Sequence, residues 1–369
     1  MGRKRTPAFL QTPATIAIRT ALAAPLVLGP QTAIGAARMA GRAWALSRFN
    51  RSRFERTTRH IREAFPELAE EEVRELGAGS YEHLFALGME LGYTSRLLTE
   101  EGFTRHLFFE DISPAIRRLL GERPCVLITG HCGNWELIGY SIALLGFPLA
   151  AVYRPLDLKP LDRWVRDMRA RRGLSLISKF GAMRALPPVL EAKYPIGLVA
   201  DQSGGDRGIF VPFFGRLTST YKSVGLLAMQ AGAQVICGTA RRLKPGEAPP
   251  PGSMRSEFSS IGPESLRYAI EITDSYGPED WENQPDPLFY LTARYRRAME
   301  SMIRRAPDQY LWMHRIWRSR APHERNGKPF PPQLRDKLLS LPWMTETDVD
   351  RVIDRSVRDA VTIAMGAEP

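Results

Sequence analysis

Residues 125–136 read CVLITGHCGNWE and join a short apolar run to the polar start of a helix. The run over 125–129 is continuous and stops at Gly130, which is typical of a buried parallel strand. Asn134 can cap the helix that follows, and Glu136 falls in its first turn. The stretch therefore predicts a strand, a tight loop and a helix, the unit from which parallel α/β sheets are built.

Short apolar runs and helical patterns alternate further along the chain. Strands are predicted over 149–153, 196–200, 235–239 and 266–273, and helices over 134–145, 161–172, 223–231 and 292–305. This order predicts an α/β fold with a mainly parallel sheet flanked by helices. We divide the chain into an N-terminal membrane-associating segment (1–50), a helical region (51–120), an α/β core (121–320) and a C-terminal extension (321–369).

The composition is that of a basic globular protein. The 369 residues include 51 Lys and Arg against 40 Asp and Glu, a formal net charge of +11, and only eight of the basic residues are lysine. An arginine-rich surface suits nucleic acid, anionic lipid head groups or an acidic protein partner. Three scattered cysteines exclude a disulfide framework and a structural zinc site, and we expect neither metal nor cofactor.

The N-terminal segment contains an uncharged stretch over 20–37 with basic residues on both sides. Its length is at the lower limit for a bilayer span, and prolines and alanines make it a weak one. It can span the membrane, lie in the interface, or form an alanine-rich core helix of a soluble protein. In either membrane arrangement the flanking arginines place the bulk of the chain on the cytoplasmic side.

The loop after the first strand carries the candidate chemistry. In open α/β sheets, binding crevices form at the carboxyl ends of strands, and His131 lies at such an end. We expect Glu136 to reach one imidazole nitrogen, so that the other nitrogen acts as general base toward a substrate hydroxyl. Cys132 is a poor candidate nucleophile, since a Cys–His pair is normally assembled from separate elements. The sequence also lacks the motifs of α/β-hydrolases and P-loop NTPases.

Five ordered segments resemble a known family. His131 to Glu136 is an HxxxxE form of the HxxxxD/E motif of glycerolipid acyltransferases, and the chain is most similar to the bacterial lipid A biosynthesis lauroyl/myristoyl acyltransferases. The other segments are YRP at 153–155, KFGA at 179–182, DQ at 201–202 followed by GIFVPFFGR at 208–216, and QYLWMHRIWR at 309–318. The resemblance covers roughly residues 15–320.

The resemblance implies direct transfer of a fatty acyl group from an acyl-carrier-protein thioester to a hydroxyl of a membrane glycolipid, such as a lipid A precursor. His131 would be the base and Glu136 its orienting acid. The residues that match the family's substrate-binding blocks are Arg154, Lys179, Asp201, Phe214, Gly215 and Arg216. The implied partners are acyl carrier protein, the lipid acceptor and the surface of the cell inner membrane, with the catalytic domain on the cytoplasmic side and no nucleic acid.

Two alternatives stay open. The acceptor can be another lipid, such as a phosphoinositol mannoside or a lysophospholipid, although the phosphoinositol mannoside enzymes usually carry Asp where Glu136 stands. From another class, the chain can be a non-catalytic basic protein that binds nucleic acid or a membrane surface. Charge alone supports that alternative, and the basic residues are spread along the whole chain.

Overall fold

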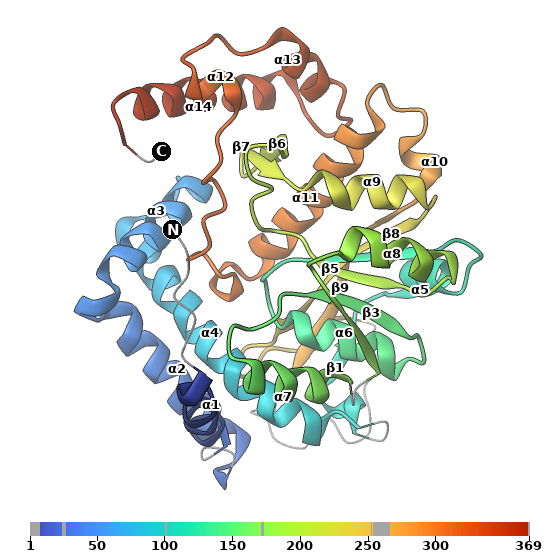
Figure 1. Ribbon diagram of the computed structural model, residues 1–369. Coiled ribbons are helices and arrows are strands. Elements are labelled where there is room, and N and C mark those ends of the chain that lie inside the picture. The colour runs from blue at the N-terminus through green and yellow to red at the C-terminus, as the bar shows by residue number, and fades with distance from the viewer. Residues whose placement is uncertain are drawn as a thin grey trace.

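The computed structural model describes residues 8–23, 27–99, 102–170, 173–251, 253 and 266–367 (Figure 1). Within these residues a seven-stranded sheet has the order β1-β9-β8-β2-β5-β3-β4, and neighbouring strands are parallel except for the antiparallel pair β8 and β9. The strands are β1 Leu107–Phe109, β2 Cys125–Thr129, β3 Leu149–Tyr153, β4 Leu174–Ser178, β5 Ile196–Val199, β8 Gln234–Arg242 and β9 Tyr268–Tyr276. A separate hairpin is formed by β6 Ile209–Phe213 and β7 Arg216–Thr220.

The mainly parallel α/β architecture predicted from the sequence is confirmed. The structure has β2 and β3 at the predicted bounds. β8 extends beyond its predicted range at both ends, and β9 begins two residues later than predicted and ends three residues later. β4 has no predicted counterpart, because it pairs only with β3 at the sheet edge and all but one of its side chains are partly exposed. Such a strand lacks the continuous apolar run that marks a buried one. β1 also lies within the region predicted as helical.

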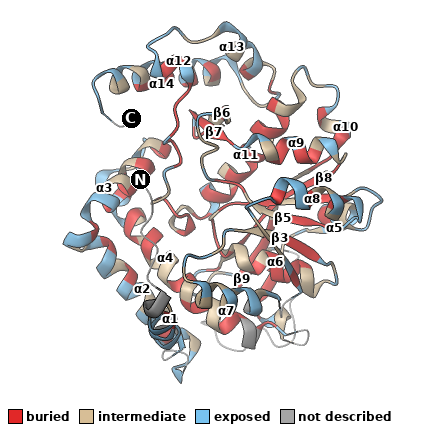
Figure 2. Ribbon diagram, in the orientation of Figure 1, coloured by how far each residue is buried: buried red, intermediate tan, exposed pale blue. Residues whose placement is uncertain are grey.

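Helices cover both faces of the sheet and leave a buried centre (Figures 1 and 2). One core cluster packs α6 on alternate strand residues, among them Leu127 and Leu149, and a second packs α8 and α9 on the others, among them Ile128. This division follows from the pleat, because successive side chains of a strand point to opposite faces. The helices of this part are α5 Ser113–Leu119, α6 Trp135–Leu144, α7 Lys159–Ala170, α8 Ala182–Glu191, α9 Lys222–Gln230, α10 Pro278–Trp281 and α11 Pro287–Arg305.

The uncharged N-terminal stretch does not form one helix. α1 (Ala8–Ala23) ends within it and α2 (Pro30–Leu46) begins within it, and residues 24–26 of the stretch lie outside the described part. α2 packs along α4 (Glu70–Leu97), so closely that a side chain at Gly41 would meet the Tyr81 carbonyl oxygen. Of the described helices, none combines the length and the hydrophobicity that a membrane crossing requires. The membrane association of residues 1–50 stays a prediction.

The C-terminal extension closes over the hairpin. It contains α12 Pro322–Arg325, α13 Pro332–Leu339 and α14 Glu346–Ala364, and α14 lies above α3 (Arg51–Ala64) in Figure 1. Arg216 donates to both carboxylate oxygens of Asp359 at 2.7 and 2.8 Å, with both side chains buried. Arg320 also contacts this carboxylate and donates at 2.9 Å to Glu324. The extension is therefore tied to the core by a buried network of charges.

We expect Asp359→Ala to destabilise the fold by about 3–5 kcal/mol, because it leaves two arginines buried without their shared carboxylate. Urea unfolding followed by circular dichroism measures this loss. Asp350→Ala, an exposed position of the same helix, is the matched control and should change the free energy of unfolding by less than about 0.5 kcal/mol. Equal effects of the two substitutions would contradict a buried network at Asp359.

Candidate active site

The loop between β2 and α6 is fixed in a tight turn that presents His131. Gly133 has a φ of +58°, and a Cβ there would lie 2.3 Å from the Ala240 carbonyl oxygen, so the position requires glycine. The Asn134 side chain caps α6 by accepting a hydrogen bond from the backbone N–H of Leu137. Its amide nitrogen also donates to the fully buried Glu90 at 2.9 Å. The predicted helix cap is therefore present and is braced from α4.

The imidazole of His131 is hydrogen-bonded to Asp201, with 2.7 Å between Nδ1 and Oδ1. Sheet register explains the pair. Thr129 at the end of β2 lies opposite Val199 at the end of β5. His131 and Asp201 each follow their strand end by two residues, so they come to lie side by side. Asp201 is fully buried, and its backbone oxygen accepts a hydrogen bond of 2.8 Å from Arg296. Two parallel strands thus bring together residues that lie 70 positions apart.

The electrostatics of this pair favour an imidazole that binds protons readily. Burial lowers the pKa of His131, but the charge and hydrogen bond of Asp201, with a smaller effect of Glu136, raise it above the ordinary value of 6.5. Burial raises the pKa of Asp201, yet the charge and hydrogen bond of His131 hold it well below its usual range. Asp201 is therefore ionised and stabilises a proton on His131.

The prediction that Glu136 holds the imidazole is wrong for this structure. Arg169, on α7, donates to Oε2 of Glu136 at 2.9 Å and also contacts Oε1. Both side chains are mostly buried, so the Glu136 carboxylate is bonded to Arg169 and not to the His131 ring. Glu136 lies near enough to act on His131 through its charge, but Nδ1 of His131 is taken by Asp201.

Two aromatic rings enclose the imidazole. The ring centroid of His131 lies 4.8 Å from that of Trp135 and 4.6 Å from that of His314. Burial and the neighbouring His131 lower the pKa of His314 to about 4, so His314 is neutral near pH 7 and His131 is the proton acceptor of the two. Burial and nearby carboxylates raise the pKa of the Cys132 thiol, so it is no thiolate nucleophile.

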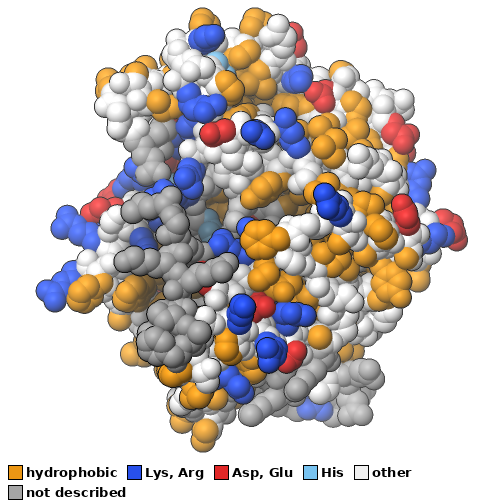
Figure 3. Space-filling model, viewed as in Figure 1, with side chains coloured by type: hydrophobic (Ala, Val, Ile, Leu, Met, Phe, Trp, Pro, Cys, Tyr) orange, Lys and Arg blue, Asp and Glu red, His pale blue; other side chains and the backbone are white. Residues whose placement is uncertain are grey.

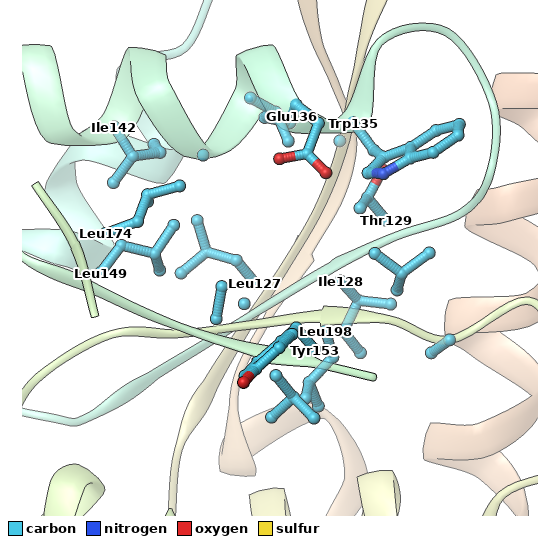
Figure 4. Close-up of a pocket in the computed structure, with 18 of the residues that line it drawn as sticks. Leu127, Ile128, Thr129, Trp135, Glu136, Ile142, Leu149, Tyr153, Leu174 and Leu198 are labelled. Atoms are coloured by element: carbon cyan, nitrogen blue, oxygen red, sulfur yellow. The ribbon is translucent and has the colours of Figure 1, made fainter. Parts of the chain in front are cut away.

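A cavity of about 810 Å³ opens beside His131, within the size range of small-ligand sites (Figure 4). Its lining is mostly apolar. The carboxyl ends of four parallel strands each add a polar side chain, namely His131 after β2, Arg154 after β3, Lys179 after β4 and Gln202 after β5. The crevice therefore lies where the topology of an α/β sheet places it. Arg154 and Lys179 are exposed at this cavity, and their substrate-binding role stays a prediction.

Four other predicted binding residues do not line this cavity. Asp201 lies buried beneath His131 instead of contacting a substrate. Phe214 and Gly215 form the turn of the β6–β7 hairpin, where Phe214 packs against Phe65 and Trp312. Arg216 is held by Asp359. The last three corrections share one cause: Phe214, Gly215 and Arg216 belong to a hairpin that forms a sheet separate from the one whose strand ends line the cavity.

Three contributors to the site were not identified from the sequence: Asp201 as the partner of His131, Arg169 as the partner of Glu136, and His314. Asp201 had a signal, because it directly follows a predicted strand, as His131 does. His314 also had one, because it lies in the QYLWMHRIWR segment at 309–318. Arg169, on α7, had none. Among the described residues, no group of three His, Cys, Asp or Glu side chains could hold a metal ion.

Comparison with known proteins gives a consistent set of relatives. A family model described as bacterial lipid A biosynthesis acyltransferase matches residues 9–259. The chain is 26% identical over 261 residues to the lipid A biosynthesis palmitoleoyltransferase of Escherichia coli (strain K12), which covers 69% of this chain and 76% of that protein. It is 24% identical over 281 residues to the lipid A biosynthesis lauroyltransferase of the same organism, which covers 74% and 81%.

Proposed function

The chain belongs to the bacterial lipid A biosynthesis acyltransferase family, and we propose that it transfers a fatty acyl chain from an acyl-carrier-protein thioester to a hydroxyl of a lipid A precursor or a similar membrane glycolipid. The observation that carries this proposal is that His131, bonded to the buried Asp201, lines a largely apolar cavity. A base beside an apolar chamber suits a reaction between a lipid alcohol and a fatty acyl thioester.

His131 is the general base of the proposed mechanism. Its Nδ1–H donates to Asp201, which leaves Nε2 free to accept a proton from the acceptor hydroxyl. The hydroxyl oxygen attacks the thioester carbonyl carbon, the C–S bond breaks, and the proton on His131 passes to the departing thiolate. No serine or thiolate nucleophile is needed, so the transfer is direct. Asp201 is a positioning residue, because it acts through His131.

Arg154 and Lys179 are proposed to bind anionic groups of the lipid acceptor. Both lie at the cavity, and neither forms an ion pair with another residue of the described ranges. Lys179 lies 5.3 Å from the ring centroid of Phe180, which keeps a cation beside an apolar surface. A guanidinium and an ammonium at the edge of an apolar site suit a phosphorylated lipid.

The apolar and basic surface of the protein also suits a membrane lipid as acceptor and an acidic carrier protein as donor. Apolar and basic side chains are interspersed on the face shown in Figure 3. Phe180 and Met183, which line the cavity, are 71% and 47% exposed, and α2 exposes Met39 and Trp44. We therefore propose that the protein works on the cytoplasmic side of the inner membrane, where anionic lipid attracts its excess of arginine. An acidic carrier protein would be attracted by the same charge.

The pH dependence of kcat/KM tests the assignment of the base. Because neutral His131 is the active form and its pKa is raised, activity should increase with pH along an acidic limb whose midpoint lies above 6.5. Initial rates with an acyl-carrier-protein donor between about pH 5 and pH 9 measure this limb. A midpoint at or below the ordinary histidine value would contradict the Asp201 contact as the dominant influence on His131.

The function itself is tested with purified protein, acyl-carrier-protein thioester and a panel of hydroxylated lipids. The panel contains a lipid A precursor, a phosphoinositol mannoside and a lysophospholipid, and mass spectrometry identifies any acylated product. We expect the lipid A precursor to gain one acyl chain. Thioester hydrolysis without an acylated lipid, or acylation of one of the other two lipids alone, would overturn the proposed acceptor.

A further inference from the structure

The backbone of residues 131–134 is held by three other parts of the chain. The partners belong to α4, to β8 and to the segment 309–311, and each loop residue has one, at distances between 2.7 and 3.1 Å. The bonds run from the Leu311 N–H to the His131 oxygen, from the Thr239 hydroxyl to the Cys132 oxygen, from the His83 ring to the Gly133 oxygen, from the Gly133 N–H to the Gln309 oxygen and from the Asn134 N–H to the Ala240 oxygen. A loop bonded at every residue has little freedom, so these partners decide where His131 lies.

Glu90 of α4 connects these partners. Its side chain is fully buried and uses both carboxylate oxygens: Oε1 is paired with Arg242 at the end of β8, and Oε2 accepts a hydrogen bond of 2.9 Å from the Asn134 amide. The backbone N–H and oxygen of Arg242 are both bonded to the Gln309 side chain, at 2.9 and 2.8 Å. Glu90 therefore joins the side chain of the loop to the strand and the segment that hold the loop backbone.

His83 lies on the same helix, about two turns before Glu90. Arg242 donates to Nδ1 of His83 at 3.0 Å, and an arginine can only donate. Burial, with a smaller effect of the Arg242 charge, lowers the pKa of His83 well below 6.5, so the ring is neutral near pH 7. Its single proton is therefore on Nε2, which donates to the Gly133 oxygen at 3.1 Å. Arg242 thus selects the tautomer in which His83 holds the loop.

We propose that Glu90 is a positioning residue of the active site, which sets where His131 lies relative to Asp201. Arg242 and His83 complete this support. Glu90 acts through the loop, because it does not itself line the cavity. A buried ion pair adds little stability compared with apolar side chains of similar size, so its value here is the fixed geometry that it imposes. The effect on rate rests on the proposed acyl transfer, whereas the effect on the position of His131 does not.

Two substitutions remove the support in different ways. Glu90→Gln keeps the size of the side chain and removes the charge that pairs with Arg242. Asn134→Ser keeps a good helix-capping residue, and its shorter side chain loses the bond to Glu90. Asp359→Asn is the matched control, because it also removes the charge from a buried arginine–carboxylate pair but lies in the C-terminal extension. If Glu90→Gln fails to fold, Asn134→Ser carries the test.

The first measurement needs no turnover. NMR of protein labelled with ¹⁵N-histidine detects the Nδ1 proton of His131, assigned by its absence from His131→Ala, and the Nε2 proton of His83. Both variants should shift the His131 signal upfield, because the bond to Asp201 lengthens, and the control should leave it in place. An unchanged signal in either variant, or an equal shift in the control, overturns the positioning role. A His83 proton on Nδ1 in the unsubstituted protein overturns the proposed network.

The second measurement is kinetic, at a temperature where every variant is folded. Glu90→Gln and Asn134→Ser should each lower kcat by about 10- to 100-fold and leave the acceptor KM unchanged, because a displaced loop impairs proton transfer and not lipid binding. The double variant should lose little more than either single variant, since both remove the same support. Asp359→Asn should keep kcat to within about twofold.

Two kinetic results would overturn the positioning role of Glu90. One is a double variant whose loss equals the product of the two single losses, because independent sites behave in this way. The other is a raised acceptor KM with unchanged kcat. Absence of transfer by the unsubstituted protein instead overturns the proposed function, and the NMR signal of His131 then decides the positioning role by itself.

Discussion

His131→Ala is expected to lower kcat for acyl transfer by about 10³-fold or more, because the variant has no base to take the proton from the acceptor hydroxyl. The ring of His131 is enclosed by Trp135 and His314, and its loop is fixed by Gly133 and the Asn134 cap, so the fold should persist. Single-turnover formation of acylated lipid from a carrier-protein thioester measures the loss.

His106→Gln is the matched histidine control for this experiment. The ring of His106 is hydrogen-bonded to the Leu266 carbonyl oxygen at 2.7 Å and does not line the cavity. It should retain the kcat of the unsubstituted protein to within about twofold. If His131→Ala kept measurable multiple turnover at a comparable rate, the general-base assignment would have to be abandoned.

Asp201→Asn is expected to reduce kcat by roughly 10⁴-fold, the size of effect seen when the carboxylate that holds a catalytic histidine becomes an amide. The amide nitrogen faces Nδ1 of His131 and favours the wrong tautomer, and it cannot stabilise the imidazolium. The shape of the side chain is kept, and Arg296 binds the backbone oxygen of residue 201, which the substitution leaves in place. The acidic limb of the residual activity should also move to lower pH.

Glu136→Gln distinguishes the observed pairing from the one predicted from the sequence. Glu136 is bonded to Arg169, so its neutral isostere should reduce kcat by about tenfold through local rearrangement and loss of its smaller charge effect on His131. Measuring kcat for Glu136→Gln and for Asp201→Asn under the same conditions tests this expectation. A larger loss for Glu136→Gln than for Asp201→Asn would restore Glu136 as the orienting acid.

A comparison of the two carboxylates explains why the sequence singled out His131 and missed the carboxylate that is bonded to it. Glu136 is close to His131 in sequence, and its place in the first turn of a helix made a contact plausible. Whether Glu136 contacts His131 depends on where its side chain points, which sequence spacing does not specify. In the first turn of α6 the Glu136 side chain lies against Arg169 of α7. Asp201 reaches His131 only because β2 and β5 are neighbours in register.

The hairpin residues Phe214, Gly215 and Arg216 illustrate the same limit. Their motif identifies the family, but a motif does not state whether its side chains face a substrate or the protein interior. Arg216 is buried against Asp359 of α14, a residue of the C-terminal extension that the motif does not include. Its ion pair therefore becomes visible only when the extension is seen folded over the hairpin.

By itself the sequence determined the strand–loop–helix unit at 125–136, the mainly parallel α/β sheet and the position of His131 at a strand end. These follow from local properties: apolar runs, capping residues and the direction of parallel strands. Only the tertiary structure decided the strand order, the carboxylate that holds His131 and the residues that line the cavity beside it. Each of these features depends on which helices and strands become neighbours. The packing of the whole chain decides this, because burying the two faces of the sheet involves apolar residues that are distant in sequence.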